Sequence, residues 1–155
     1  MLKIYLNKLK NYKINRFYNF LCGMFIFLSS CVAPPKYSDG LLNNLPAIVN
    51  ETDYFSLSIF GEDFNDSLVW DLELSLTETD ILLSTLIVKD LNILFSELST
   101  LVMTDASGDT IFNANITNDI IFTSEDSISL IGVPSSISLN AQNFTGRLEY
   151  QLIKK

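Results

Sequence analysis

Alternation of apolar and polar residues is the feature that most limits the folds open to this chain. In residues 68–76, four leucines and a tryptophan occupy every second position, while two acids and a serine fill three of the four positions between them. Successive side chains of a β-strand point to opposite faces of a sheet, so this pattern predicts a strand with one buried face. Residues 55–59 alternate in the same way. Between these two strands, residues 61–67 are expected to form a polar loop.

Short β-like runs continue to the C-terminus, with turn-forming residues between them. The runs are 98–103, 110–115, 120–122, 128–131, 137–141 and 144–153, and the turn signals lie at 107–108, 118–119, 134 and 140–143. Several short strands at this spacing predict an antiparallel two-sheet β-sandwich.

One segment has a different period. Between Thr79 and Ser99, leucine and isoleucine recur at steps of three and four, and polar residues do the same on the opposite side. This spacing predicts an α-helix from about Asp80 to Val88, with Thr79 or Asp80 as its N-cap. Several β-branched residues in the segment argue against a helix.

The N-terminus has the layout of a secretory signal peptide. Residues 1–16 carry five basic residues and no acid, and residues 17–28 are apolar except for Asn19 and Gly23. A basic region before a short apolar region is typical of a cleaved signal. The apolar run is shorter than the roughly 20 residues that a membrane-spanning helix needs.

The signal ends in Leu28-Ser29-Ser30-Cys31, which resembles the lipobox of bacterial lipoproteins. The resemblance implies that a diacylglycerol is attached to the Cys31 sulfur, that signal peptidase II cuts between Ser30 and Cys31, and that the new amino terminus is acylated, for example with palmitate. Two or more acyl chains anchor a protein stably in a bilayer. The alternative is a chance cysteine after an ordinary signal peptide.

Three regions are therefore expected. Residues 1–30 are a lipoprotein signal peptide, residues 31–50 are the lipidated cysteine and a flexible tether, and residues 51–155 are one β-sandwich domain. Val32 follows the cysteine, where an aspartate would mark retention in the inner membrane. In a host with two membranes, the expected location is the outer membrane, with the domain facing the periplasm.

Charge and composition limit the chemistry. From Cys31 onward the chain has eighteen acids and five bases, a net charge of −13. This balance argues against nucleic-acid binding, which needs a basic surface. The chain has no histidine, Cys22 leaves with the signal, and Cys31 is acylated. No Ser-His-Asp site, disulfide or thiol site is then available, so neither enzymatic activity nor a metal or other cofactor is expected.

One short stretch could in principle bind an ion. Oxygen-bearing side chains at Asp105, Ser107 and Asp109 resemble the opening of a calcium loop. The glycine is at the fourth place rather than the sixth, and no glutamate closes the loop at the twelfth. The favoured interpretation is a β-hairpin turn.

Downstream of the anchor, the layout resembles the TssJ family of type VI secretion lipoproteins. The resemblance rests on a strand at 54–60, a loop containing Asn65, a strand at 68–76, a helix from Asp80, and a Leu-Gly-Val-like core in 129–137. It implies a transthyretin-type sandwich with one short inserted helix. It also implies docking to the periplasmic part of an inner-membrane secretion subunit (TssM in that family). The contact would be made by the loop between the first two strands: Glu62, Asp63, Phe64, Asn65 and Asp66.

Two roles for that loop remain open. An exposed Phe64 among acids would anchor a basic partner, or the loop would be solvated, with Phe64 folded onto the core. The alternative function is a lipoprotein that binds a small ligand, an ion or a glycan. An enzyme that uses paired carboxylates is a third hypothesis, which no particular residue favours.

Overall fold

The computed structural model describes residues 40–92 and 98–155, which belong to one compact unit, Asp39–Lys155. The described residues form seven strands and one short helix. They are β1 (Ala47–Asn50), β2 (Tyr54–Asp71), β3 (Ile81–Lys89), β4 (Ser99–Asp105), β5 (Thr110–Ile116), β6 (Ile120–Ser127), α2 (Ile128–Ile131) and β7 (Pro134–Lys154). The predicted antiparallel, mainly β fold is confirmed.

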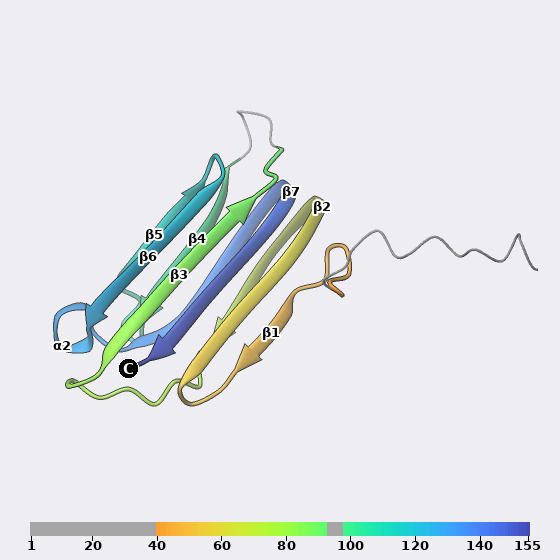
Figure 1. Ribbon diagram of the computed structural model, residues 1–155. Helices are drawn as coiled ribbons and strands as arrows, with labels where there is room; N and C mark the ends of the chain where they lie inside the picture. The colour runs from red at the N-terminus through yellow and green to blue at the C-terminus, as the bar shows by residue number, and fades with distance from the viewer. Residues whose placement is uncertain (1–39, 93–97) are drawn as a thin grey trace, which may run out of the picture. The chain divides into compact units, whose positions relative to one another are not determined.

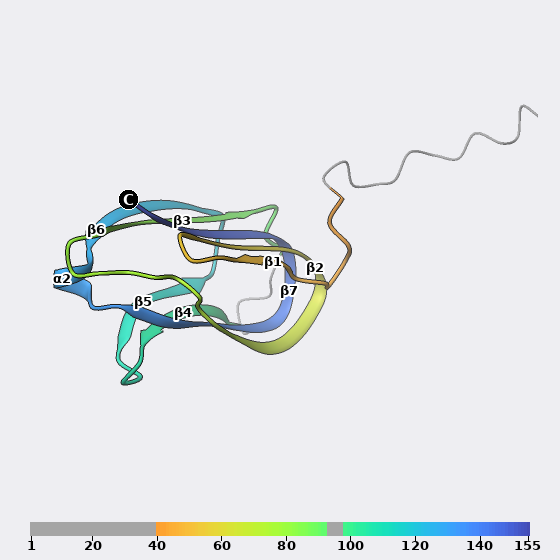
Figure 2. The same ribbon diagram turned by 90° about the horizontal axis from the view of Figure 1, so that it is seen from below.

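All seven strands belong to one antiparallel sheet. Its main order is β1-β2-β7-β3-β6, and β7 also pairs with β4, which pairs with β5. The long strands β2 and β7 lie side by side from Tyr54 opposite Ile153 to Asp71 opposite Ser136 (Figure 1). Both strands bend in the middle, so the sheet turns back and its two halves face each other (Figure 2). Because β2 and β7 run through the bend, the expectation of two separate sheets is not confirmed.

The bend lies where the sequence predicted a loop. The pairing of β2 with β7 shifts register between Gly61 and Phe64 and again between Phe64 and Asp66. Asp63 and Asn143 have left-handed backbones, with φ of 50° and 46°. Extra residues of this kind bend a strand and raise its twist. Residues 61–67 are therefore the middle of β2, and the turn predicted at 140–143 is the middle of β7.

The hydrophobic core fills the space between the two halves of the sheet. Tyr150 of β7 is fully buried, and its ring stacks on Phe112 of β5, with ring centroids 5.8 Å apart. Its hydroxyl approaches Sδ of Met103 in β4 at 3.8 Å. The ring of Phe112 also lies 5.3 Å from that of Phe122 in β6. These contacts join β4 and β5 to the half of the sheet that contains β6 and the end of β7.

The predicted helix at Asp80–Val88 is wrong, because this segment is strand β3. It pairs with β6 on one side and with β7 on the other. Every second residue is buried, namely Leu82, Ser84, Leu86 and Val88. The residues between them are also mostly apolar and partly buried. Apolar residues on both faces of a strand produce steps of three and four by coincidence.

The one described helix occupies a different position. Ile128–Ile131, predicted as a strand, forms the single turn α2 between β6 and β7. Gly132 ends this turn with φ of 83°, a conformation that favours glycine. The turn lies where the chain crosses from one half of the sheet to the other (Figure 2).

Two strand boundaries also differ from expectation. The strand predicted at 68–76 ends at Asp71, and residues 72–76 run on toward β3 while Leu74 is buried at 9% exposure. Ala47–Asn50, expected as the end of the tether, forms β1 and pairs with β2. Apolar and polar residues can alternate along an extended segment even where no neighbouring strand pairs with it. The alternation at 72–76 therefore did not show that β2 ends at Asp71.

Candidate functional site

Two predicted site residues, Ser30 and Cys31, lie outside the described residues. Their processing and lipidation therefore stay predictions. Within residues 40–92 and 98–155, no helix has the length and apolar character needed to cross a membrane.

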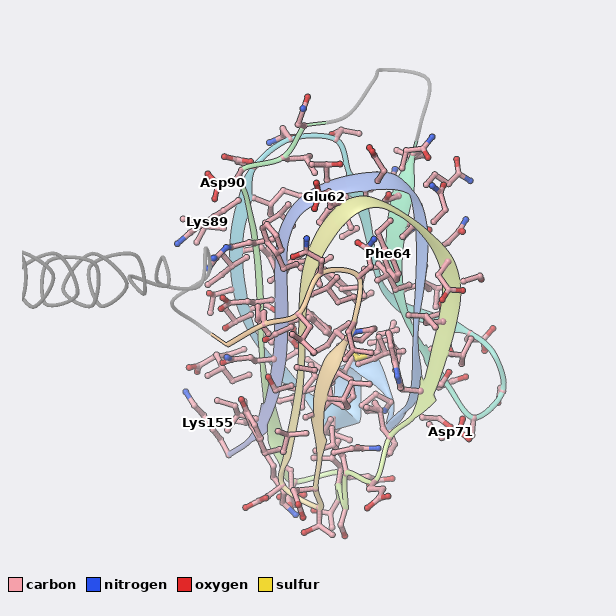
Figure 3. All side chains as sticks on the ribbon, turned by 90° about the vertical axis from the view of Figure 1, so that its right-hand side faces the viewer. Glu62, Phe64, Asp71, Lys89, Asp90 and Lys155 are labelled. Atoms are coloured by element: carbon pink, nitrogen blue, oxygen red, sulfur yellow. The ribbon has the colours of Figure 1, made fainter. Side chains whose placement is uncertain are left out.

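The predicted partner-binding residues lie at the bend of β2. Glu62, Asp63, Asn65 and Asp66 are exposed there. Phe64 is only 6% exposed and lies opposite Phe144 of β7, inside the core. The interpretation of Phe64 as an exposed anchor is therefore wrong, and its alternative, packing onto the core, is confirmed. We call Glu62, Asp63, Asn65 and Asp66 the acidic corner (Figure 3).

Side-chain hydrogen bonds hold the backbone of the acidic corner. The Asn65 side-chain amide donates to Oδ1 of Asn143, and the Asn143 backbone N–H donates back to Oδ1 of Asn65 at 2.8 Å. The Asp63 backbone N–H donates to Oγ1 of Thr145 at 2.9 Å. These bonds join β2 to β7 where the register shift interrupts their ladder, so they restrict the corner to one conformation.

The segment before β1 supports the corner from the other side. The backbone N–H of Glu62 donates to Oδ1 of Asn44 at 2.8 Å, and Nδ2 of Asn44 donates to the Glu62 carbonyl at 2.9 Å. Nδ2 of Asn43 donates to the Glu62 carboxylate at 2.6 Å. Glu62 is thus fixed at both its backbone and its side chain, while it remains at the surface.

Basic residues are few among the described residues, and they lie either near the bend or near the C-terminal end of β7. The described residues carry sixteen acids and four bases, a net charge of −12. Lys89 lies opposite Arg147, whose guanidinium is 5.5 Å from the centre of the Phe60 ring. In Figure 3, Lys89 is at the same end as Glu62, and Asp71 and Lys155 are at the other end.

The hairpin interpretation of Asp105–Asp109 is confirmed. These residues connect β4 to β5, and the Asp105 N–H donates to the Asp109 carbonyl at 3.0 Å. Oδ1 of Asp105 accepts the backbone N–H groups of Ser107 at 2.8 Å and Asp109 at 2.9 Å. Asp105 therefore serves the turn. In the part of the chain that the structure describes, no group of three or more His, Cys, Asp or Glu residues could hold a metal ion.

A second polar cluster, which the sequence analysis missed, lies before β3. Oδ2 of Asp80 accepts the Thr77 N–H at 2.6 Å and the Thr77 hydroxyl at 2.8 Å. Nζ of Lys154 lies 3.1 Å from the same oxygen. The hydrogen bonds from Thr77, and then Lys154, lower the pKa of Asp80 below its ordinary value of 3.8. The Thr-x-x-Asp spacing is the local signal for this turn, but Lys154 comes from the other end of the chain.

The comparisons with known proteins give no relative for this chain. No protein-family model, curated protein or solved structure matches it. The TssJ resemblance, its secretion partner and its membrane location therefore stay proposals. The inserted helix from Asp80 that the resemblance implies is wrong, because residues 81–89 form β3.

Proposed function

We propose that this chain is a lipid-anchored protein of the cell envelope that docks a partner protein through its acidic corner. In this proposal, Cys31 carries the lipid and the partner is the periplasmic part of an inner-membrane secretion subunit in a type VI complex. The bent sheet, with its two facing halves, would correspond to the transthyretin-type sandwich of the TssJ family.

The observation that carries the proposal is the fixed geometry of the corner. Asn65, Asn143 and Thr145 restrict a backbone on which three carboxylates are exposed. A surface that is already ordered loses less conformational entropy on binding than a mobile loop does. The buried Phe64 supports the corner from inside and leaves the contact itself to polar groups.

Charge supports a basic partner. The described unit has a net charge of −12, and the corner contributes Glu62, Asp63 and Asp66 to it. Opposite charges across an interface accelerate association and suppress wrong partners more than they add affinity. The contact should therefore weaken as the salt concentration rises, because exposed charges are screened.

The test is cross-linking of the full lipoprotein in intact cells, followed by mass spectrometry of the captured proteins. The variant is Asp66→Lys, because Asp66 hydrogen-bonds the adjacent Ser67 N–H at 2.8 Å and takes no part in the Asn65–Asn143 pair. The matched control is Asp71→Lys, the same charge change at the C-terminal end of β2, away from the bend (Figure 3). Both variants should unfold at the wild-type temperature.

The proposal expects one large inner-membrane protein to be captured by the wild type and by Asp71→Lys, and to be lost in Asp66→Lys. Equal capture by all three proteins would show that the corner is not the contact. Capture of outer-membrane or cell-wall components alone would contradict the secretion complex.

A further inference from the structure

An uncharged apolar segment precedes the folded strands, and we call residues 41–49 the apolar strip. From Gly40 to Asn50 the chain has no acid and no base, although the described unit as a whole has a net charge of −12. Four large apolar side chains of the strip are exposed: Leu42 at 65%, Leu45 at 56%, Ile48 at 40% and Val49 at 46%. Leu42 and Leu45 are the most exposed of the four, and exposed apolar side chains in a segment without charges indicate a surface that another apolar surface covers.

Local structure holds the side chains of Leu42 and Leu45 outward. The Leu45 N–H approaches the Leu42 carbonyl at 3.4 Å, which makes a turn of these residues. Between them, Asn44 has φ of 59° and its N–H donates to the Phe60 carbonyl at 2.8 Å. Asn43 and Asn44 also bind Glu62, as described above. The turn is thus attached to β2 by its asparagines, and its leucines face away from the core.

The position of the strip in the chain indicates what covers it. Eight residues lie between Cys31 and Gly40, which makes nine steps from one Cα to the next, and an extended chain spans at most about 3.6 Å per step. If Cys31 is lipidated, the first described residue can lie no more than about 30 Å from the bilayer surface. So short a connection keeps the apolar strip close to the bilayer and raises the effective concentration of lipid around it. Even a weak apolar interaction between the strip and the lipid would then be formed most of the time.

We infer that the apolar strip rests on the lipid surface in which Cys31 is anchored, so that the folded unit has a fixed side toward the membrane. The inference rests on the proposed lipid anchor and adds an orientation to it. β1 and β6 are the two ends of the main sheet order (Figure 1). With β1 against the lipid, β6 would therefore lie away from the bilayer. The acidic corner, attached to the strip through Glu62, would then present its carboxylates close to the headgroups.

The experiment uses the full lipidated chain, purified from membranes and reconstituted into phosphatidylcholine vesicles that contain brominated lipid. Under the proposed processing the mature chain has no free thiol, so Leu45→Cys can carry a single environment-sensitive fluorophore. Ile121→Cys is the matched control, because Ile121 is 79% exposed on β6 at the opposite end of the sheet order. Vesicle flotation is measured on the same samples.

We expect both labelled proteins to float with the vesicles, and the fluorophore at position 45 to be quenched several-fold more than the one at position 121. Adding Leu42→Asn to the Leu45→Cys protein should reduce that quenching without changing flotation. Flotation with equal quenching at the two positions would overturn the inference and leave the anchor intact. Failure to float would refute the anchor, and the inference with it.

Two further outcomes would assign the strip to another occupant. A spectral shift at position 45 that appears without vesicles and grows with protein concentration would indicate a second copy of this chain. Loss of the cross-linked envelope protein in Leu42→Asn, with lipid quenching absent from position 45, would make the strip part of the protein-docking surface. Either result would overturn the assignment to lipid.

Discussion

Gly61 shows how a single residue allows the sheet to bend. A Cβ at this position would lie 2.4 Å from Cδ1 of Phe144 and 2.6 Å from its backbone carbonyl oxygen. Real Cβ atoms essentially never approach other heavy atoms so closely, so β2 and β7 can come together here only if residue 61 has no side chain. The sequence marks this position only as a glycine before an acidic stretch.

The first prediction concerns this contact. Gly61→Ala should lower the free energy of unfolding by about 3 kcal/mol, the upper end for overpacking a core, because the Phe144 backbone cannot move aside as a flexible side chain would. Urea denaturation measures it. Gly108→Ala is the control: it has no atom within 4 Å of the added Cβ and φ of 87°, so only backbone strain of about 1 kcal/mol applies. An equal loss in the two variants would contradict the close contact.

Asp80 supplies the second prediction, which concerns pH. Its folded-state pKa lies below 3.8, so it stabilises the fold when ionised. That stabilisation is present above the unfolded pKa and is lost as the pH falls through the folded pKa. Asp80→Asn should therefore be less stable than the wild type at pH 7, and the difference in unfolding free energy should shrink toward zero once the pH falls below the folded-state pKa of Asp80.

The control for Asp80 is Lys154→Met. Hydrogen bonds from Thr77 are the larger causes of the lowered pKa, and Lys154 comes after them. Lys154→Met should therefore keep most of the wild-type decrease in unfolding free energy between pH 7 and acid pH. If Lys154→Met removed that pH-dependent decrease as completely as Asp80→Asn does, the ion pair rather than the Thr77 turn would be the source of the stabilisation by Asp80.

At the scale of elements, the bend depends on a pair of asparagines. Asn65 in β2 and Asn143 in β7 exchange hydrogen bonds where the ladder of the two strands is interrupted. The Asn65 side chain takes part in both bonds, so its removal loses both. Removal of the Asn143 side chain loses only the bond to Oδ1 of Asn143, because the other bond is donated by the Asn143 backbone N–H.

The third prediction is that these two residues are coupled. Asn65→Ala should lower the unfolding free energy by about 1 kcal/mol for each of its two lost hydrogen bonds, and Asn143→Gly should lower it by about half as much, because it loses one bond. The double variant should lose little more than Asn65→Ala alone. Glycine is used at position 143 because φ there is 46°. A double-mutant cycle in urea measures the coupling. Additive losses would show that the corner is not held by this pair.

The strand β3 shows where reasoning from the sequence about elements failed. Ser84, a polar residue in an apolar segment, is only 3% exposed and hydrogen-bonds the hydroxyl of Tyr150. Burial raises the pKa of Tyr150 above its ordinary value of 10.0. The contact between Ser84 and a tyrosine sixty-six positions later in the chain leaves no mark on local periodicity, so the sequence did not show that this segment is a buried strand.

At the scale of the molecule, β7 is the strand on which the sheet depends. It pairs with β2, β3 and β4 and contributes Leu148, Tyr150 and Leu152 to the core. Its pairing with β2 joins residues as far apart in the chain as Tyr54 and Ile153. The chain loses much conformational entropy when it forms such non-local contacts, and β-rich domains that depend on them fold slowly for this reason.

The fourth prediction follows from that dependence. A chain that ends at Arg147 should not fold, because it lacks the three buried residues named above, six of the fifteen residue pairs with β2 and seven of the eight pairs with β3. Loss of the β-sheet signal in circular dichroism checks this. The control is a chain that begins at Gly40 and keeps every described strand, which should give the full signal. Folding of the shortened chain would mean that β7 is less central than the sheet order indicates.

Local patterns were sufficient for several parts of this protein. Alternation identified a mainly β, antiparallel chain, and the Asp105–Asp109 turn was recognised because its side chain and glycine act within five residues. The runs at 98–103 and 110–115 became β4 and β5. In each case the residues that make the structure are close together in the chain, so the sequence carries the whole cause.

Contacts between distant residues decided the rest. The predicted loop at 61–67 became a bent strand because β7 pairs with β2 on both sides of the bend, and Phe64 became core because Phe144 lies opposite it. The segment at 81–89 became a strand because β6 and β7 pair with its two edges. These partners lie between about thirty and one hundred positions away along the chain. Periodicity shows how apolar and polar residues alternate along a segment, but not which other segment covers each of its faces. Only the folded chain determines those contacts.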